Sequence, residues 1–300
     1  MSDKQRVENL VILGLGLIGG SLARALRKSG FAKNYIGYGH REPSLKRGLE
    51  LGVIDEYTLN LSEAIERADI LVIAAPTLIA ADMLKQILPQ LEGRSHNPVI
   101  TDVASVKGIL RDTATELVGH MPPNLVLGHP IAGSENSGVD ASSEDLFVNH
   151  RVILTPVEGN DSGAVSLVRD MWLSTGAEVV DMDVDEHDAV LAATSHLPHV
   201  LAYTLVDALA QSDASEDIFR FAAGGFRDFT RIASSDPVMW RDISIANKRA
   251  LLDTIDMYSA SLSVLREAVA AEDADGLLET FSRAKRARDE FSAILAARSK

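Results

Sequence analysis

The sequence predicts an α/β fold in which a Rossmann-type, doubly wound and mostly parallel sheet is followed by an all-helical domain. Two observations support this prediction. Over roughly the first 180 residues, short strand-like apolar runs alternate with helical runs, which is typical of a parallel sheet with helices on both faces. After Asp181 no convincing strand follows, and alanine- and leucine-rich helical patterns continue to Lys300. We therefore expect one domain over residues 1–181 and a second over residues 182–300.

The expected strands are short apolar runs of the kind that form a buried parallel sheet. The run at residues 70–75 is apolar throughout and Pro76 ends it, as expected for a strand covered on both faces. Helical runs follow the early strands, to about Lys28, from Pro43 onward and to about Leu88. The other expected strands cover residues 11–13, 35–38, 98–102, 124–128, 151–154 and 177–180.

The composition is that of a soluble globular protein and excludes several kinds of site. The chain has no cysteine, which excludes disulfides, thiolate metal sites, iron–sulfur clusters and a thiol nucleophile. Its formal net charge of -14 argues against nucleic-acid binding, which needs basic patches. No apolar stretch reaches the roughly 18 residues of a bilayer span, and no secretory cleavage site is evident. We therefore expect a cytoplasmic protein that binds neither nucleic acid nor membrane.

The long helix expected from Ala189 to Ala210 is unusually apolar. Its apolar side chains lie almost all round the helix, which is typical of a helix buried on most sides, in a domain core or between subunits. Pro198 lies near its middle, where it removes a backbone hydrogen bond, so we expect a kink there.

A glycine motif after the first strand indicates a dinucleotide site. Gly14 permits a tight turn, Gly16 lets the backbone approach a pyrophosphate, and Gly19 allows the following helix to pack on the strand. The free N–H groups at the start of that helix favour a phosphate. A glycine-rich turn without a ligand is the alternative. The further cofactor-binding residues that we expect are Leu17, Ile18 and Pro76.

The end of the second strand favours NADP⁺ over NAD⁺. In NAD⁺-binding folds an acidic residue at this position holds the ribose hydroxyls. Here Tyr38 is followed by Gly39, His40 and Arg41, and Glu42 lies past the expected position. A neutral residue with an adjacent arginine suits a 2′-phosphate. The alternative is that Arg41 is a solvated loop residue and that NAD⁺ is used.

His129 is the candidate catalytic base. It follows a predicted strand at the sheet edge that faces the cofactor in this fold, and imidazole can take a hydroxyl proton while hydride leaves the same carbon. The alternative is a structural histidine in a turn. Ser105 follows the preceding strand; it either caps the next helix, or orients His129 or touches the nicotinamide. Lys107 reads as a solvated residue of the first helical turn.

Four stretches of the sequence resemble the prephenate/arogenate (cyclohexadienyl) dehydrogenases of tyrosine biosynthesis. They cover residues 102–107, 129–133, 195–199 and 224–233, and residues 235–243 extend the match. The resemblance spans nearly the whole chain. It implies NAD(P)⁺-dependent oxidative decarboxylation of prephenate or arogenate, giving 4-hydroxyphenylpyruvate or tyrosine, without a metal and in a homodimer built by the helical half.

The resemblance also implies roles for individual residues. His129 would be the base for the ring hydroxyl, Ser105 would assist it, and Arg231 would hold a substrate carboxylate. His199 would lie in the same pocket, with His196 as support. The remaining residues implied to border the substrate are Gly224, in a glycine loop, Trp240 and Glu135.

Several alternatives stay open on the sequence. Arg231 could be a surface ion pair, and Trp240 is more often a core residue than a contact. A metal site at His196 and His199 lacks a third ligand in reach. A β-hydroxyacid dehydrogenase would share the two-domain layout but would carry a lysine where this chain has these histidines. A non-catalytic NAD(P)-binding sensor is the alternative outside enzymes. No residue distinguishes a keto from an amino side chain of the substrate.

Overall fold

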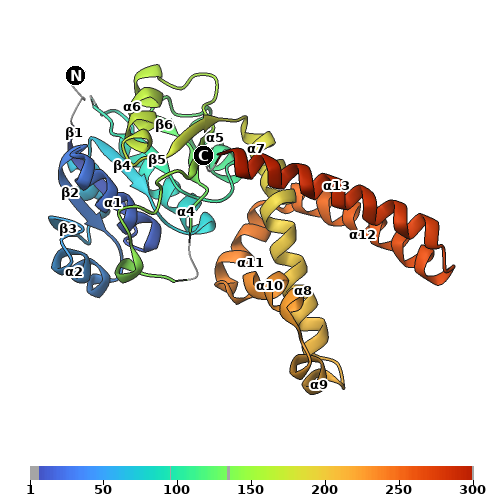
Figure 1. The fold of residues 1–300 in the computed structure, drawn as a ribbon. Coiled ribbons are helices and arrows are strands. Elements are labelled where there is room, and N and C mark those ends of the chain that lie inside the picture. Colours follow the sequence, from blue (N-terminus) through green and yellow to red (C-terminus); the bar gives the residue numbers. More distant parts are fainter. Residues whose placement is uncertain (1–6, 95, 134–135, 299–300) are drawn as a thin grey trace. The chain divides into compact units, whose positions relative to one another are not determined.

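The computed structural model describes residues 7–94, 96–133 and 136–298 (Figure 1). The chain forms two compact units, one ending at Leu251 and one beginning at Leu252. The domain boundary expected near residue 181 lies inside the first unit and stays a prediction. Each unit is described by itself.

The first unit is built on a six-stranded, entirely parallel sheet. Its strand order is β3-β2-β1-β4-β5-β6, so the chain reverses its direction of growth between β1 and β4. The predicted Rossmann-type sheet is thereby confirmed. The sequence missed only β3, whose three residues carry no continuous apolar run. The strands are β1 (Val7–Leu13), β2 (Ala32–Tyr38), β3 (Glu56–Thr58), β4 (Ile70–Ile73), β5 (Val99–Asp102) and β6 (Leu125–Val126).

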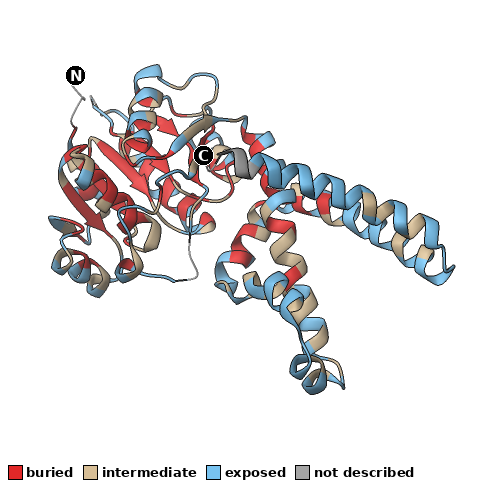
Figure 2. Cartoon of the chain, in the orientation of Figure 1, coloured by how far each residue is buried: buried red, intermediate tan, exposed pale blue. Residues whose placement is uncertain are grey.

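Helices cover both faces of this sheet because the strand side chains alternate between two cores. Leu10 and Ile12 pack with Trp172 of α6 on one face, while Val11 and Leu13 pack with Leu84 of α4 on the other. In Figure 2 the central strands are buried along their length. The helices are α1 (Leu17–Ser29), α2 (Glu42–Glu50), α3 (Leu61–Arg67), α4 (Thr77–Ile87), α5 (Gly108–Val118) and α6 (Ser162–Leu173), with 3₁₀ turns at Leu88–Leu91 and Val139–Ala141.

The last two expected strands, and the second part of the run 124–128, do not join the parallel sheet. The run 124–128 divides at Leu127, and its second part begins β7 (Gly128–Pro130) of a separate sheet with β8 (Arg151–Leu154) and β9 (Glu178–Asp181). β7 and β8 are antiparallel, whereas β8 and β9 are parallel. The division follows from hydrogen bonding, because the N–H of Gly128 bonds the Asp102 carboxylate instead of a neighbouring strand. His129 therefore lies on the small sheet.

The predicted long helix is interrupted, as its proline suggested. α7 (Val184–Leu191) runs into a π-helical turn (Ala192–His196) and then into α8 (Leu197–Ala210), with Pro198 in the first turn of α8. A proline lacks the N–H that continues the bonding pattern, so the preceding turn widens. Within this unit α8 buries only Leu197 and Ala202, so this helix is not buried on most sides in a domain core, and its burial between subunits stays a prediction.

By length and composition, Val184–Ala210 could cross a membrane. The expectation that no apolar stretch is long enough was therefore wrong. The reason is that Asp185, Glu186 and Asp188 lie near the start of this segment and Asp207 near its end, which leaves an apolar stretch between them. Helices in the cores of soluble proteins pass the same test.

Shorter helices complete the first unit, and two long helices account for the second. The short ones are α9 (Ser215–Arg220), α10 (Gly224–Thr230) and α11 (Pro237–Ala246), with a 3₁₀ turn at Arg231–Ser234. α12 (Lys248–Ala270) begins in the first unit, and α13 (Ala274–Arg298) lies in the second. Both long helices are exposed along most of their length (Figure 2). The exposed apolar side chains on them include Met257, Leu262, Val264, Leu278 and Phe281.

Candidate active site

The glycine motif lies where the sheet order reverses, and two of its positions admit only glycine. Gly14 has a φ of 104°, and a Cβ there would lie 2.4 Å from the carbonyl oxygen of Ala74. A Cβ on Gly19 would lie 2.2 Å from the carbonyl oxygen of Gly14. These contacts hold the β1–α1 turn against the end of β4.

The third glycine faces open space. A Cβ on Gly16 would meet no atom within 4 Å, so the backbone is accessible beside the start of α1. The first N–H groups of a helix have no partner within the helix, and here Leu17 and Ile18 supply them. Pro76 is exposed at the start of α4 on the same edge of the sheet. This arrangement fits a pyrophosphate group.

The end of β2 presents His40 and Arg41, which are both exposed. Glu42, the nearest carboxylate, is already engaged, because it accepts a hydrogen bond from Tyr57 (2.9 Å) and pairs with Lys46 (3.2 Å). These contacts do not put the Glu42 carboxylate in the position of the acidic residue that binds the ribose in NAD⁺ sites.

His129 begins a chain of hydrogen bonds that ends on a carboxylate. Its Nδ1 lies 2.9 Å from Nε2 of His187, and Nδ1 of His187 lies 2.8 Å from the carboxylate of Asp188. That carboxylate also accepts the backbone N–H groups of Lys107 (2.9 Å) and Gly108 (2.8 Å) at the start of α5. α7 is thus fixed to α5 through the residue that orients the histidines.

This chain of hydrogen bonds determines which nitrogen carries the proton in His129 and in His187. Because a carboxylate only accepts, Nδ1 of His187 must donate to it, which leaves Nε2 of a neutral His187 as an acceptor. Nδ1 of His129 then donates, and its Nε2 carries the lone pair. Within the part of the chain that the structure describes, no residue bonds this Nε2. A neutral His129 is therefore arranged as a base.

The surroundings keep both histidines neutral. Burial lowers the pKa of His129 well below its usual value, and the neighbouring His187 and Lys107 lower it further. Burial also lowers the pKa of His187, although Asp188 opposes that change. Burial alone would raise the pKa of Asp188, but the hydrogen bonds from His187 and the two backbone N–H groups lower it. Asp188 thus remains the anion of the chain.

Lys107 is buried and not solvated, which corrects the sequence expectation. Its ammonium group pairs with the carboxylate of Asp102 and donates to the carbonyl oxygen of Gly128 (2.6 Å). The other oxygen of Asp102 accepts the N–H of Gly128 (3.2 Å). One ion pair therefore holds both backbone groups of the residue that precedes His129.

Ser105 does not cap the following helix. The N-cap residue of α5 is Lys107, and the carboxylate of Asp188 caps the helix from outside the segment. Among the described residues Ser105 makes no hydrogen bond to His129, whose Nδ1 bonds His187 instead. Ser105 is partly buried beyond the carboxyl end of β5.

His199 and Trp240, two of the residues expected around the substrate, contact each other. His199 is half-buried and stacks on Trp240, with ring centroids 3.6 Å apart. Burial lowers the pKa of His199, its hydrogen bond to the Ser195 carbonyl opposes that shift, and nearby Arg231 lowers it further. Trp240 packs with Val106 and Ile243, so it is a core residue that also contacts His199. Asp236 caps the helix that carries it.

Two expectations on the substrate side are changed or outside the described residues. Gly224 is exposed and begins α10, so it belongs to a helix and not to a glycine loop. Glu135 lies outside the described residues.

The sequence alone did not indicate the residues that orient His129. His187 and Asp188 are adjacent in the chain, and their position just after the last strand was the available signal. Nothing in the sequence showed that this pair contacts β7 or α5. Asn247, which bonds His196, was also missed.

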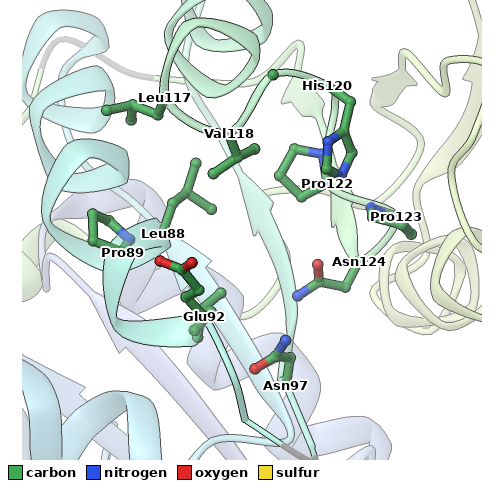
Figure 3. A pocket seen from close by; sticks show the side chains of 12 residues that line it. Leu88, Pro89, Glu92, Asn97, Leu117, Val118, His120, Pro122, Pro123 and Asn124 are labelled. Atoms are coloured by element: carbon green, nitrogen blue, oxygen red, sulfur yellow. The ribbon is translucent and has the colours of Figure 1, made fainter.

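A hollow of about 580 Å³ lies at the opposite end of the sheet and is a different feature. It is lined by the ends of α4 and α5 and by the segments that lead into β5 and β6, including Glu92, His120 and Asn124 (Figure 3). None of its lining residues belongs to the histidine chain. The histidine chain lies instead at the carboxyl ends of the strands, where parallel α/β sheets bind ligands.

Two family models match this chain. The model of the prephenate dehydrogenase nucleotide-binding domain matches residues 22–181, and that of the prephenate dehydrogenase dimerization domain matches residues 183–283. A prephenate dehydrogenase of Bacillus subtilis is 39% identical over 95% of this chain and 76% of its own length. A cyclohexadienyl dehydrogenase of Zymomonas mobilis is 36% identical over 94% and 95%.

Solved structures agree with these matches. Prephenate dehydrogenase from Aquifex aeolicus, in complex with hydroxyphenyl propionate and NAD⁺, is 36% identical with a TM-score of 0.87, covering 96% of this chain and 100% of that one. Arogenate dehydrogenase from Synechocystis is 29% identical with a TM-score of 0.78, covering 94% and 99%.

The glycine motif generates a paired prediction. Gly14→Ala forces a Cβ against Ala74 at a positive φ and should cost about 1–3 kcal/mol of unfolding free energy. Gly16→Ala should leave stability within about 0.5 kcal/mol but weaken dinucleotide binding, because its Cβ enters the space left for phosphate. Urea unfolding and titration with NADH measure the two effects. Unchanged dinucleotide affinity of Gly16→Ala would contradict this location.

Proposed function

Because this chain belongs to the prephenate dehydrogenase family, we propose that it catalyses the oxidative decarboxylation of prephenate, arogenate or both. It is an NAD(P)⁺-dependent oxidoreductase with a small-molecule substrate. The products would be 4-hydroxyphenylpyruvate from prephenate and tyrosine from arogenate. The observation that carries the proposal is the base at His129, oriented by His187 and Asp188 and located at the carboxyl ends of the strands. The family match replaces the alternative of a β-hydroxyacid dehydrogenase.

His129 would accept the proton of the ring hydroxyl at Nε2. The C4–H bond breaks with transfer of hydride, and the hydroxyl becomes a ketone conjugated with the ring diene. The bond from C1 to its carboxylate then breaks, CO₂ leaves, and the electron pair completes the aromatic ring as a phenolate, whose oxygen would take back the proton from His129. Bound NAD(P)⁺ supplies the hydride acceptor. Aromatisation drives the reaction, so the proposal needs no metal.

The hydrogen-bond chain would stabilise the charge that His129 acquires. When Nε2 is protonated, the ring becomes a cation whose Nδ1–H donates to His187, and His187 donates to the Asp188 anion. The chain needs no rearrangement for this step, because the donors already point the right way. Such preorganisation lowers the barrier for proton transfer.

Arg231 and His199 would hold the carboxylated side chain of the substrate. The substrate is a dianion and the protein has a net charge of -14, so cations must be fixed locally. Arg231 is exposed beside the half-buried His199. A guanidinium group can bind a carboxylate through two parallel hydrogen bonds. In this proposal Trp240 backs His199, while Gly224 and Glu135 border the substrate and Ser105 contacts the nicotinamide.

We also propose a cytoplasmic homodimer that binds neither nucleic acid nor membrane. Exposed apolar side chains on α12 and α13 support association of the helical domain, as does the name of the family model that matches it. Sedimentation at micromolar concentration measures the oligomeric state, and a monomer would contradict the dimer.

Replacement of the base tests the function directly. His129→Asn should lower kcat by about 10²–10⁴ while the fold and NAD(P)⁺ binding persist, because the variant has no basic nitrogen. The assay is the absorbance rise at 340 nm with prephenate or arogenate and either cofactor. His120→Asn, at an exposed position in the hollow of Figure 3, is the matched control. No absorbance rise in the wild-type protein would favour the sensor alternative.

The lowered pKa of His129 predicts the acidic limb of the pH profile. Only the neutral ring accepts a proton, so activity is lost as pH falls through its pKa. Because burial lowers that pKa well below the usual 6.5, kcat/KM should persist below pH 6.5 and decline only at lower pH. Circular dichroism at each pH controls for unfolding. An acidic limb centred at 6.5 or above would contradict the buried base.

Removal of the proposed carboxylate contact should affect substrate binding most. Arg231→Ala should raise KM for the substrate by about 10- to 100-fold with a smaller effect on kcat, because one charge-assisted hydrogen-bond pair is lost. Arg283→Ala, an exposed arginine on α13, is the control. An unchanged KM would show that Arg231 is a surface residue only.

A substitution at the end of β2 tests the preference for NADP⁺ over NAD⁺. We propose that His40 and Arg41 bind a 2′-phosphate, supported by their exposure and by the engagement of Glu42 elsewhere. Arg41→Ala should then raise KM for NADP⁺ by about 10-fold and leave that for NAD⁺ unchanged. Steady-state kinetics with both cofactors decides the question. A strong wild-type preference for NAD⁺ would overturn the phosphate role.

A further inference from the structure

Asn247 occupies a buried position between the two histidine-bearing helices. It follows α11, and its side-chain amide nitrogen lies 2.8 Å from the carbonyl oxygen of Asp188 and 3.1 Å from Nδ1 of His196. The side chain is 5% exposed. It therefore contacts at once the residue that orients His187 and the histidine at the end of the π-helical turn.

These two contacts fix the proton on His196. A carbonyl oxygen only accepts, so Asn247 must present its NH₂ group to Asp188, and not its amide oxygen. The same NH₂ group faces Nδ1 of His196, which must then be the acceptor. A neutral His196 consequently carries its proton on Nε2. This assignment follows because the backbone carbonyl of Asp188 can only accept, whichever way the oxygen and nitrogen of the Asn247 amide are assigned.

Burial keeps His196 neutral, helped by His187 and His199, although the Asp188 carboxylate opposes this effect. It is 1% exposed, and its ring lies edge-on to Trp240 with centroids 6.2 Å apart. The titratable groups that act on it are Asp188 and His187 on α7 and His199 on α8, and His196 in turn acts on His129 of β7. Burial lowers its pKa to about 4. The ring is thus neutral at neutral pH.

The proton on Nε2 of His196 has no acceptor among the described residues. The fully buried side-chain atoms without a partner do not include Nε2 of His196, so this N–H group is open to water or a ligand, which normally satisfies such a donor. His129 and His199, the two proposed active-site histidines, are both close enough to influence His196 or be influenced by it. The N–H group is therefore a donor placed among the residues of the proposed substrate site.

We propose that Asn247 is a positioning residue for the reaction, which holds His196 as a neutral Nε2–H donor to a substrate oxygen. The proposal rests on the proposed role of His129 as the base. A charged His196 would add a positive charge close to His129 and oppose proton transfer to it. By anchoring the carbonyl of Asp188, Asn247 also steadies the residue whose carboxylate orients His187.

The first test measures the tautomer of His196 in the wild-type protein. Nitrogen NMR of ¹⁵N-histidine-labelled protein distinguishes the two neutral tautomers and the charged ring, and His196→Gln assigns the signal. We expect His196 to show the neutral Nε2–H form from about pH 5.5 to 8, since its pKa lies below this range. A proton on Nδ1, or titration near the usual histidine value, would overturn the proposal.

The second test reverses the hydrogen bond. Asn247→Asp presents only acceptors, so His196 should take a proton on Nδ1, and kcat should fall by about 10-fold or more. Asn247→Leu, which is similar in size and has no donor, should release the tautomer preference and lower kcat while KM for NAD(P)⁺ stays unchanged. Asn124→Leu is the matched control, because it removes an asparagine bond to the Pro98 carbonyl far from the site. Unchanged tautomer and unchanged kcat in both Asn247 variants would overturn the proposal.

The proposed function and the role of Asn247 can be overturned independently. If His129→Asn keeps its kcat, the proposed function fails, and with it the catalytic purpose of Asn247. If His129→Asn loses activity but His196 shows the wrong tautomer, only the role of Asn247 fails.

Discussion

The carboxylate of Asp188 is the interaction on which the site depends. It accepts hydrogen bonds from the side chain of His187 and from two backbone N–H groups at the start of α5, while its own backbone carbonyl accepts from Asn247. A single residue therefore caps a helix of the nucleotide-binding sheet, orients a histidine and connects to α11. A neutral residue in its place would leave buried donors unpaired and remove the anion that stabilises a protonated His129.

The buried pair of Asp102 and Lys107 illustrates the same use of charge for position. Burying two ions is costly, and apolar residues of the same size are often as stable. Here the pair bonds both backbone groups of Gly128 and so fixes the start of β7. The adjacent residue is His129. The ion pair thus fixes the position of the residue next to His129, and the charge of Lys107 also lowers the pKa of His129.

Burial lowers the pKa values of all four histidines of the site. His129, His187, His196 and His199 all have lowered pKa values, and loss of water is the largest cause for each. Neutral imidazoles can act as directional donors and acceptors, whereas four imidazolium ions would repel one another. The cluster therefore forms an ordered array of neutral hydrogen-bonding groups, and in the proposed function the cation for the anionic substrate is Arg231.

The sequence by itself determined the Rossmann-type sheet, the glycine turn, the helical second half and the family. These features depend on local pattern: apolar runs set strands, and the turn at Gly14 needs a residue without a side chain. Local pattern also singled out His129. It could not show that Lys107 is buried, that Ser105 leaves the helix cap to Asp188, or that residues 128–130 leave the parallel sheet. Those facts were decided by hydrogen bonds between residues 81 and 58 positions apart, such as Lys107 with Asp188 and His129 with His187, and such pairs exist only once the chain has folded.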